Sequence, residues 1–572
     1  MAGIAGIYDK RKSILLKHCI GIMLLRLRHR GAQYTKTFCY RRLILGQVDT
    51  ATIYKKNRRV SYVHKGHHLA VVCDSKILNY EILKKKLQKK GYVFISEDDA
   101  ELIAALYVEY KQKSARHIDG IFAYVVYDKK NKKIFGVRDH FGQKPLVYHV
   151  SKKLFLFASE AKSILSQLSK KTIDNQAVYH YLSLGFMPSP YTGFKEIKKL
   201  AAGSYFIFDI ATHRLTVHKY FNLPINTKKR CRRSTWISKI SISLHTAIKK
   251  HTKEEIVGMI LLPITCPRIS NFISAHGINI QKISLGDSTN VHHPSQYFLK
   301  QKNKKDWIKI IEHLDEPFAD PSILSISLLA KKAKKSVSTI INTHASTELF
   351  VRSKKHRDIF YSNLFPNFNK LLVFFFKKNI SMSLLLATVS QKSIPRQYYD
   401  YTNFFDSETK RVILDKNLYK YSWSTIFVTN IESKISNIKD HRDQLFYMDM
   451  HLNIPDNVNT LYEKVYRRSG LEMKTPLLDL NFVKLVTKMK RYHNISLFGR
   501  KNIFNIMFDR YSNGTQLPST IDLFDTWIRE QKLNYKILSE LGIHVPTTLS
   551  SHQFYLLKIL EIWYKKHFAY EN

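Results

Sequence analysis

Few residues in this sequence have types and spacing that by themselves support chemistry. Two adjacent histidine pairs, His67 with His68 and His292 with His293, offer imidazole nitrogens of the kind that bind zinc. Both pairs lie in polar stretches, where adjacent histidines are typical of an exposed surface, so we predict no metal site. No Ser/His/Asp arrangement and no Walker-type glycine loop can be proposed from spacing. The elements that position the remaining candidates must therefore be considered first.

The composition indicates a globular protein with a large excess of positive charge. The 572 residues suffice for two or three domains, and no apolar run is long enough to span a membrane. Five cysteines form no CxxC pair, which favours reduced thiols and a cytoplasmic location. The net charge of +48 has two possible explanations. A nucleic-acid partner is one, because basic surfaces neutralise phosphates. Compositional drift is the other, because the basic residues are spread from end to end of the chain. We favour drift, and expect no specific nucleic-acid partner and no membrane partner.

Apolar runs and turn residues predict two α/β domains. Residues 1–215 contain short strands at 69–73, 122–127, 154–158 and 203–209, interrupted by helices at 80–91 and 100–112. A basic, non-periodic stretch at 216–234 indicates a linker. Residues 235–572 begin with alternating helices and buried strands, at 235–250, 256–262, 321–335 and 337–341. This alternation is typical of a parallel sheet, and the pattern becomes mainly helical after about residue 355.

Six ordered motifs resemble those of glutamine-hydrolysing asparagine synthetases. They are residues 28–31 (RHRG), 137–148 (VRDHFGQKPLVY), 157–160 (FASE), 315–322 (DEPFADPS), 348–350 (ELF) and 470–479 (GLEMKTPLLD). The resemblance implies an N-terminal αββα (Ntn-type) glutaminase-like domain, followed by a Rossmann-like α/β synthetase domain with a helical C-terminal part. It also implies two sites joined by an ammonia tunnel, one that hydrolyses glutamine and one that uses ATP to adenylate aspartate.

The glutaminase positions implied by the resemblance have lost their chemistry. Alanine stands at position 2, where the family has the cysteine nucleophile, and a methyl group cannot form an acyl intermediate. The family's Asn-Gly-Glu segment, which supplies oxyanion donors and a glutamine contact, aligns with Asp74, Ser75 and Lys76. The arginine that holds the glutamine carboxylate would fall within 46–50, where none remains. Asp99 matches the retained acid for the substrate α-amine.

The synthetase positions implied by the resemblance are also changed. The pyrophosphate loop aligns with residues 262–268, where both glycines are replaced, two prolines remove N–H donors, and Cys266 replaces the magnesium-binding aspartate. Arg268 in this loop is expected to be a solvated side chain. The implied ATP-binding positions are Leu261, Leu285, Asn342 and Thr343.

Other charged groups of the implied synthetase site differ too. In the second nucleotide loop, at 342–350, Glu348 is the retained acid, whereas His344 and Thr347 replace two acids. The lysine that stabilises the transferring phosphorus is replaced by Leu517. The family's Lys and Asp-Arg on a later helix are Leu461 and residues 463–464. Adenylyl transfer depends on positioning and charge neutralisation, so these losses together predict a large loss of rate.

These observations predict a family fold with little or none of the family chemistry. By descent the function is ATP-dependent amidation of aspartate with glutamine-derived ammonia, and the substrates would be glutamine, aspartate and ATP with Mg²⁺. One alternative is a non-catalytic shell that binds an active paralogue, a ligand or a second copy of itself. Another is a basic nucleic-acid-binding protein. A gene in decay, with stability lost next, explains the same pattern.

Overall fold

The computed structural model describes residues 2–11, 15–50, 60–225, 231–252, 256–261, 267–284, 304–364, 393–420, 426–490, 502–511 and 531–568. Several positions discussed above lie outside these ranges: residues 262–266 of the pyrophosphate loop, Leu285, the pair His292 and His293, and Leu517. No helix in the described part of the chain is both long and apolar enough to cross a membrane.

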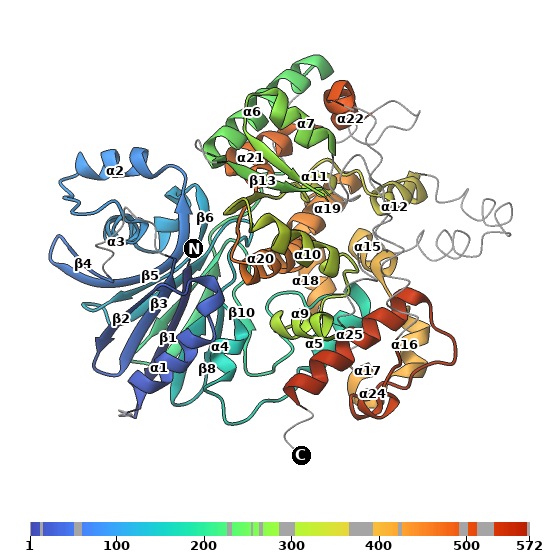
Figure 1. Ribbon diagram of the computed structural model, residues 1–572, viewed down its shortest axis with the longest axis horizontal. Helices are drawn as coiled ribbons and strands as arrows, with labels where there is room; N and C mark the ends of the chain where they lie inside the picture. Colours follow the sequence, from blue (N-terminus) through green and yellow to red (C-terminus); the bar gives the residue numbers. More distant parts are fainter. Residues whose placement is uncertain are drawn as a thin grey trace.

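The N-terminal part folds as two six-stranded antiparallel sheets packed face to face (Figure 1). The first sheet has the order β10-β8-β9-β1-β3-β2, with bounds Lys198–Lys199, Val147–Val150, Leu154–Ala158, Ala2–Asp9, Leu43–Asp49 and Tyr34–Tyr40. The second has the order β12-β11-β7-β6-β5-β4, with bounds Arg214–Lys219, Ser204–Asp209, Lys133–Arg138, Gly120–Asp128, His67–Ile77 and Ser61–His64. Buried side chains from both sheets fill the space between them.

Helices cover the outer face of each sheet and complete four αββα layers. Helix α1 (Leu16–Leu25) packs on β1 and β3, and helix α3 (Asp99–Tyr110) packs on β5 beside α2 (Tyr80–Gln88). Because both faces of the central strands are covered, they carry continuous apolar runs, as in β6. Helix α3 begins where the Asp98 carboxylate accepts from the Ala100 N–H, an N-cap interaction. The expected N-terminal fold is confirmed.

A four-stranded parallel sheet forms the core of the C-terminal part. Its order is β14-β13-β15-β16, with bounds Ile280–Ile283, Val257–Ile260, Thr339–Ile341 and Glu472–Lys474. Helices α6 (Arg233–Thr252) and α7 (Pro267–Ala275) share a core with one face of this sheet. Helices α10 (Ile323–Ala333) and α20 (Asn459–Arg468) share a core with the other. This is the expected Rossmann-like arrangement.

The remaining described elements are mainly helical. They are η1 (Arg28–Arg30), η2 (Lys111–His117), α4 (Ala161–Leu165), α5 (Asn175–Leu184), α9 (Lys304–His313), α11 (Ser346–Leu349), α12 (Lys354–Leu364), α15 (Ile394–Thr402), α16 (Ser407–Ile413), α17 (Lys416–Tyr419), α18 (Ile426–Ile435), α19 (His441–Met448), the π-helix η3 (Asp449–Val458), η4 (Pro476–Leu478), α21 (Leu480–Lys488), α22 (Ile503–Phe508), η6 (Asp509–Tyr511), α24 (Tyr535–Glu540) and α25 (Ser551–His567).

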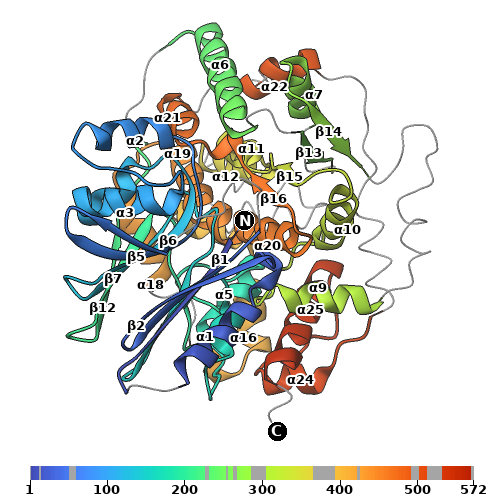
Figure 2. The ribbon, with the colours of Figure 1, turned by 60° about the vertical axis from the view of Figure 1, so that its left-hand side comes forward.

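The two parts share a hydrophobic core instead of meeting at a simple boundary. Helix α5 lies between β9 and β10 in the chain but packs among C-terminal helices, and the Tyr181 hydroxyl donates to the Leu556 carbonyl of α25 at 2.9 Å (Figures 1 and 2). The boundary expected at residue 215 falls inside β12, and α6 begins within the expected linker. Strand β12 is an edge strand with mostly exposed side chains, so it lacks the apolar alternation that marks a strand in sequence.

Candidate functional site

The glutaminase-like position lies at the start of β1, beside the middle of β5. Ala2 is buried, and its main-chain N–H donates to the Asp74 carboxylate with a distance of 3.3 Å between Ala2 N and Asp74 Oδ1. The fold therefore brings position 2 and Asp74 together, as the motif alignment implied. The alanine methyl group offers no nucleophile at this point.

Three basic side chains surround the buried Asp74 carboxylate. Its oxygens lie 3.3 Å from Lys144 Nζ, 3.5 Å from Arg30 Nη2 and 3.6 Å from Arg467 Nη2. Burial alone would raise the pKa of Asp74, but Lys144, Arg467 and Arg30 lower it below its usual range. Asp74 is therefore ionised, and its charge is balanced by three cations that the family motifs do not assign to it.

Arg30 links this carboxylate to the C-terminal part of the chain. Its guanidinium, fully buried, donates to Glu160 Oε1 at 2.7 Å and to Glu463 Oε1 at 2.5 Å. Glu463 lies on α20, where it also accepts from Arg467 Nε at 3.2 Å. We name Arg30, Asp74, Glu160, Glu463 and Arg467, together with Lys144, the interface network. It joins β5, η1 and α20 across the contact between the two parts.

The other glutamine-binding positions are hydrogen-bonded within the protein. Asp99 Oδ2 accepts from Ser75 Oγ at 2.9 Å and from the Ile77 N–H at 3.3 Å. Lys76 lies between them on β5 and is partly buried. Gln47, in the segment that lacks the expected arginine, accepts from the Cys73 N–H at 3.1 Å. The polar groups that would face a glutamine substrate thus bond to one another.

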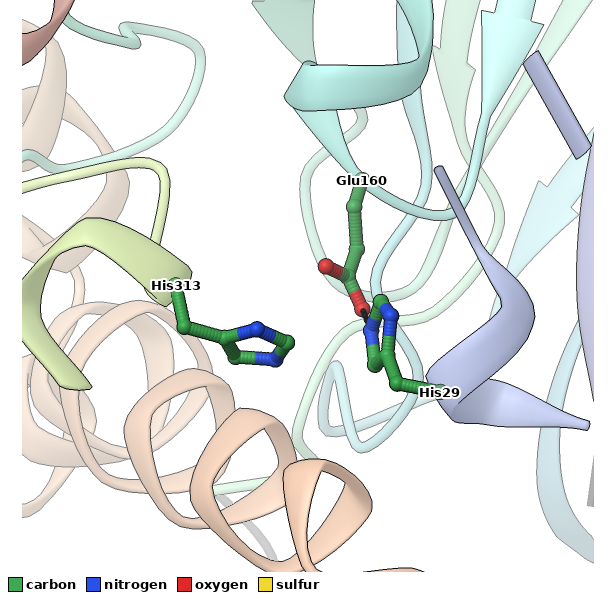
Figure 3. Close-up of side chains that lie close together, drawn as sticks. All are labelled: His29, Glu160 and His313. Carbon is green, nitrogen blue, oxygen red and sulfur yellow. Dashed lines mark hydrogen bonds and ion pairs between the residues drawn. The ribbon is translucent and has the colours of Figure 1, made fainter. Parts of the chain in front are cut away.

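His29, Glu160 and His313 form a group whose ligand atoms lie within 4.8 Å of one another (Figure 3). A His₂Glu set has the chemistry of a zinc site. However, Glu160 Oε1 already accepts from His29 Nε2 and Arg30 Nη1, and Glu160 Oε2 lies 2.7 Å from Lys162 Nζ. Arg30 and Lys162 therefore already supply the positive charge that a metal would bring. We interpret the group as part of the ion-pair contact.

The implied nucleotide positions lie at the carboxyl ends of the parallel strands. Leu261 follows β13, and its N–H donates to the Ile283 carbonyl of β14 at 2.9 Å. Asn342 and Thr343 follow β15, and the hydroxyl of Thr343 is buried without a hydrogen-bond partner. The carboxyl edge is where open α/β sheets bind ligands. These three positions therefore lie at that edge, whereas the loop at 262–266 lies outside the described residues.

Glu348 is part of a second group of buried and partly buried charges. Its Oε2 accepts from Thr347 Oγ1 at 2.8 Å, and its Oε1 accepts from Asn453 Nδ2 at 3.3 Å. Burial and the nearby Asp449 carboxylate raise the pKa of Glu348 to about 7. Asp449 lies 2.5 Å from His356 Nε2 and 3.2 Å from Lys355 Nζ. Burial opposes ionisation of Asp449, but Lys355 and His356 lower its pKa.

The side chains that replace the lost acids are not magnesium ligands. His344 is buried against the Tyr462 ring, with 3.9 Å between ring centroids, and burial lowers its pKa to about 3, so it is neutral. Of the three loop positions, only Glu348 offers a carboxylate, because Thr347 offers a hydroxyl and His344 a neutral imidazole. The nearby Asp449 carboxylate is paired with Lys355 and His356, so this set does not fit a cation preferring several oxygens. Arg268 was expected to be a solvated side chain. Its side chain is 37% exposed, and its Nη1 lies 2.7 Å from Asp509 Oδ1, because α7 packs beside η6.

The members of the interface network around Asp74 could not be recognised as neighbours from the sequence. Arg30 and Lys144 stand inside quoted motifs, at 28–31 and 137–148, and Glu463 was noted only as a substitution. These residues cluster because α20 contacts η1. The two elements are far apart in the chain: Arg30 and Glu463, which form a hydrogen bond, are 433 residues apart. The sequence signal was that charged residues stand inside these motifs. Buried charges require partners.

Comparison with known proteins gives two family matches along the chain. Residues 1–221 match the glutamine amidotransferase domain, and residues 287–512 match asparagine synthase. Asparagine synthetase [glutamine-hydrolyzing] 1 of Bacillus subtilis is 23% identical over 509 residues, covering 84% of this chain and 79% of that protein. A putative asparagine synthetase [glutamine-hydrolyzing] 2 of Methanocaldococcus jannaschii is 27% identical over 397 residues, covering 61% and 75%. A solved Bacillus subtilis glutamine phosphoribosylpyrophosphate amidotransferase covers 53% of this chain and 70% of its own, at 14% identity and a TM-score of 0.30, and supports no argument.

Proposed function

The chain belongs to the glutamine-hydrolysing asparagine synthetase family, and we propose that it keeps the family's folded body without the family's glutaminase reaction. One observation carries this proposal: the buried Ala2 lies 3.3 Å from an ionised Asp74 that is held by three cations. Glutamine, aspartate and ATP remain the family's substrates.

Two physical requirements of glutamine hydrolysis are unmet at this position. Acyl transfer needs a nucleophile, which a methyl group cannot supply. It also needs hydrogen-bond donors aimed at the developing oxyanion, and an ionised Asp74 can only accept. The neighbouring cations do not replace those donors, because Asp74 and Glu463 already neutralise them.

The space between the two implied sites also argues against ammonia transfer. The interface network occupies the contact between β5, η1 and α20 with fully buried charged side chains. Beside it, a cavity of about 20 Å³, lined in part by Glu160, Lys199 and Lys464, is the size of a single water molecule. Charged groups that are paired in a buried site resist displacement. We therefore propose that the two parts of this chain do not exchange ammonia.

A second candidate function is amide synthesis from free ammonia. Glu348 favours it, because this acid is retained at the edge of the parallel sheet and its pKa of about 7 allows proton exchange at neutral pH. The lost acids at His344 and Thr347 argue against it, since adenylyl transfer requires neutralisation of phosphate charge. We therefore rank ammonia-dependent synthesis below the first proposal, in which the chain is a silent, non-catalytic family member. Such a protein would bind an active paralogue or a second copy of itself.

Glutamate release tests the first proposal. Purified protein with glutamine, alone or with ATP, Mg²⁺ and aspartate, is expected to produce glutamate at the rate of a heat-inactivated sample. The Bacillus subtilis asparagine synthetase 1, assayed beside it, is the positive control. Glutamate production above the inactivated sample would contradict the proposal.

Pyrophosphate release separates the two candidates. With ATP, Mg²⁺, aspartate and ammonium, the silent-member proposal expects no pyrophosphate, whereas residual ammonia-dependent synthesis expects pyrophosphate that is lost in Glu348→Gln. Pyrophosphate release that persists in Glu348→Gln would show that another group carries the reaction. Co-purification with an intact synthetase would support the shell function.

A further inference from the structure

An open cavity of about 820 Å³ lies at the hairpin end of the N-terminal sandwich, away from Ala2. Three hairpin turns form it, those between β2 and β3, between β6 and β7, and between β11 and β12, together with the end of β1. Its lining residues are Tyr8, Tyr40, Arg41, Arg42, Leu43, Tyr127, Lys129, Lys132, Ile210 and Ala211. The volume falls within the range of small-molecule sites.

The charges of this cavity are all positive. Among the described residues, its lining contains four cations and no acid; the four are Arg41, Arg42, Lys129 and Lys132. Acids of the same turns are used within the turns themselves. Asp128 accepts from the Asn131 side chain at 2.7 Å, and Asp209 accepts from the N–H groups of Ala211 and Thr212 at 2.9 and 3.0 Å. The cations are therefore left to balance a negative charge from outside.

Tyrosine rings form the wall of the cavity beside these cations. Tyr8 and Tyr127 are buried, and the Tyr40 ring lies 6.0 Å from the Tyr127 ring between centroids. Lys129 Nζ lies 4.7 Å and Arg41 Cζ 5.5 Å from the Tyr40 centroid. Burial and the neighbouring Tyr40 raise the pKa of Tyr127 to about 12, so its phenol stays protonated. Aromatic faces beside cations bind bases by stacking and phosphates by charge.

We propose that this cavity binds a nucleotidyl group, with the base against the tyrosine wall and the phosphate against Arg41, Arg42, Lys129 and Lys132. A carboxylate ligand would leave most of the positive charge unbalanced, and an apolar ligand would leave all of it. Free nucleotides and the phosphorylated end of a nucleic acid share this chemistry. The proposal does not depend on whether the chain retains family activity.

The backbone at two of the cations permits a clean test. Arg41 and Lys132 occupy turn positions with φ of 52° and 51°, in the left-handed region that favours glycine. Glycine at either position removes the cation while relieving backbone strain, so a loss of binding cannot be attributed to misfolding. Lys65, at φ 47° in the β4–β5 turn, provides a matched control, because it lies outside the cavity and pairs with Glu109 at 3.8 Å.

The experiment measures calorimetric binding of AMP to the full chain at physiological ionic strength. We expect AMP to bind, adenosine and inorganic phosphate to bind more weakly, and Arg41→Gly and Lys132→Gly each to weaken AMP binding about tenfold. Lys65→Gly should leave it unchanged. No AMP binding, or equal loss in Lys65→Gly, would overturn the proposal, since the latter indicates only general attraction to a protein of net charge +48.

Photo-crosslinking locates the bound nucleotide. 8-Azido-AMP is expected to label peptides from 34–49 or 120–132, and label confined to the carboxyl edge of the parallel sheet would overturn the proposal. A 5′-phosphorylated oligoribonucleotide added as competitor identifies the source. If the oligoribonucleotide prevents labelling at a far lower concentration than AMP does, the cavity is a site for nucleic-acid ends. If the two compete equally, it is a site for free nucleotides.

Discussion

Asp74 and Glu348 mark the two implied sites, and their pKa values move in opposite directions. Asp74 is the more buried of the two, and desolvation alone would make it the weaker acid. Yet its pKa is lowered, because Lys144, Arg467 and Arg30 surround it, whereas the pKa of Glu348 is raised to about 7, because burial and Asp449 act together. The comparison teaches that neighbouring charges override burial at Asp74, whereas at Glu348 burial and a neighbouring charge shift the pKa in the same direction. It also separates a fixed structural ion pair from a group that titrates near neutrality.

The largest expected effect comes from removing the Asp74 charge. Asp74→Asn leaves Lys144, Arg30 and Arg467 short of a buried partner, which is expected to cost about 3–5 kcal/mol of stability at neutral pH. Because the folded pKa is lowered, this stabilisation is present above about pH 4 and disappears in acid. Chemical denaturation at pH 7 and pH 3 measures it. Asp9→Asn, whose partner Arg11 is exposed, is the control and should cost much less. Equal losses of stability in the two variants would show that pairing with Asp74 does not stabilise the three cations.

Glu348 should show the opposite dependence on pH. Because its folded pKa is raised to about 7 from an ordinary value of 4.5, its contribution to stability is fully present below pH 4.5 and is lost as pH rises through 7. Glu348→Gln is therefore expected to gain roughly 1–3 kcal/mol over the wild type between pH 5 and pH 8. Thermal unfolding across this range measures the gain. A variant that follows the wild-type profile would place the pKa of Glu348 near its ordinary value.

Replacing Asp449 should make the pH dependence of Glu348 more like that of Asp74. Asp449→Asn removes the repelling charge and leaves Lys355 and His356 near Glu348, so the pKa of Glu348 should fall by roughly one unit. The pH at which stability is lost is then expected to shift downward in the same unfolding profile. An unchanged midpoint would mean that burial, and not Asp449, accounts for the raised pKa. The Glu348→Gln/Asp449→Asn double variant, which should lack the transition, is the control.

The smallest expected effect is that of restoring the nucleophile. Ala2→Cys, with removal of the initiator methionine verified by mass spectrometry, is expected to release glutamate only at background, because Asp74 still stands where oxyanion donors are needed. The glutamate assay described above measures it, and unmodified protein is the control. Glutamate release by this single variant would show that the interface network leaves the pocket usable.

Local patterns in the sequence indicated two α/β parts, and the family resemblance implied their αββα and Rossmann-like architectures. An apolar run placed a strand at 154–158, which are the observed bounds of β9. Strand β12 was missed because its exposed edge position removes the apolar signal. The positions of the candidate site were also predictable, since Ala2 and Asp74 do meet.

What the sequence determined by itself is the set of groups present: a methyl at position 2, an acid at 74, an acid at 348 and an excess of cations. Only the tertiary structure decided which charges face one another. Arg30 reaches Glu463 across more than 400 residues, and Asp449 approaches Glu348 from a π-helix far along the chain. The pKa of a buried group depends on charges within a few ångströms, and such distances are set by packing and not by order in the sequence.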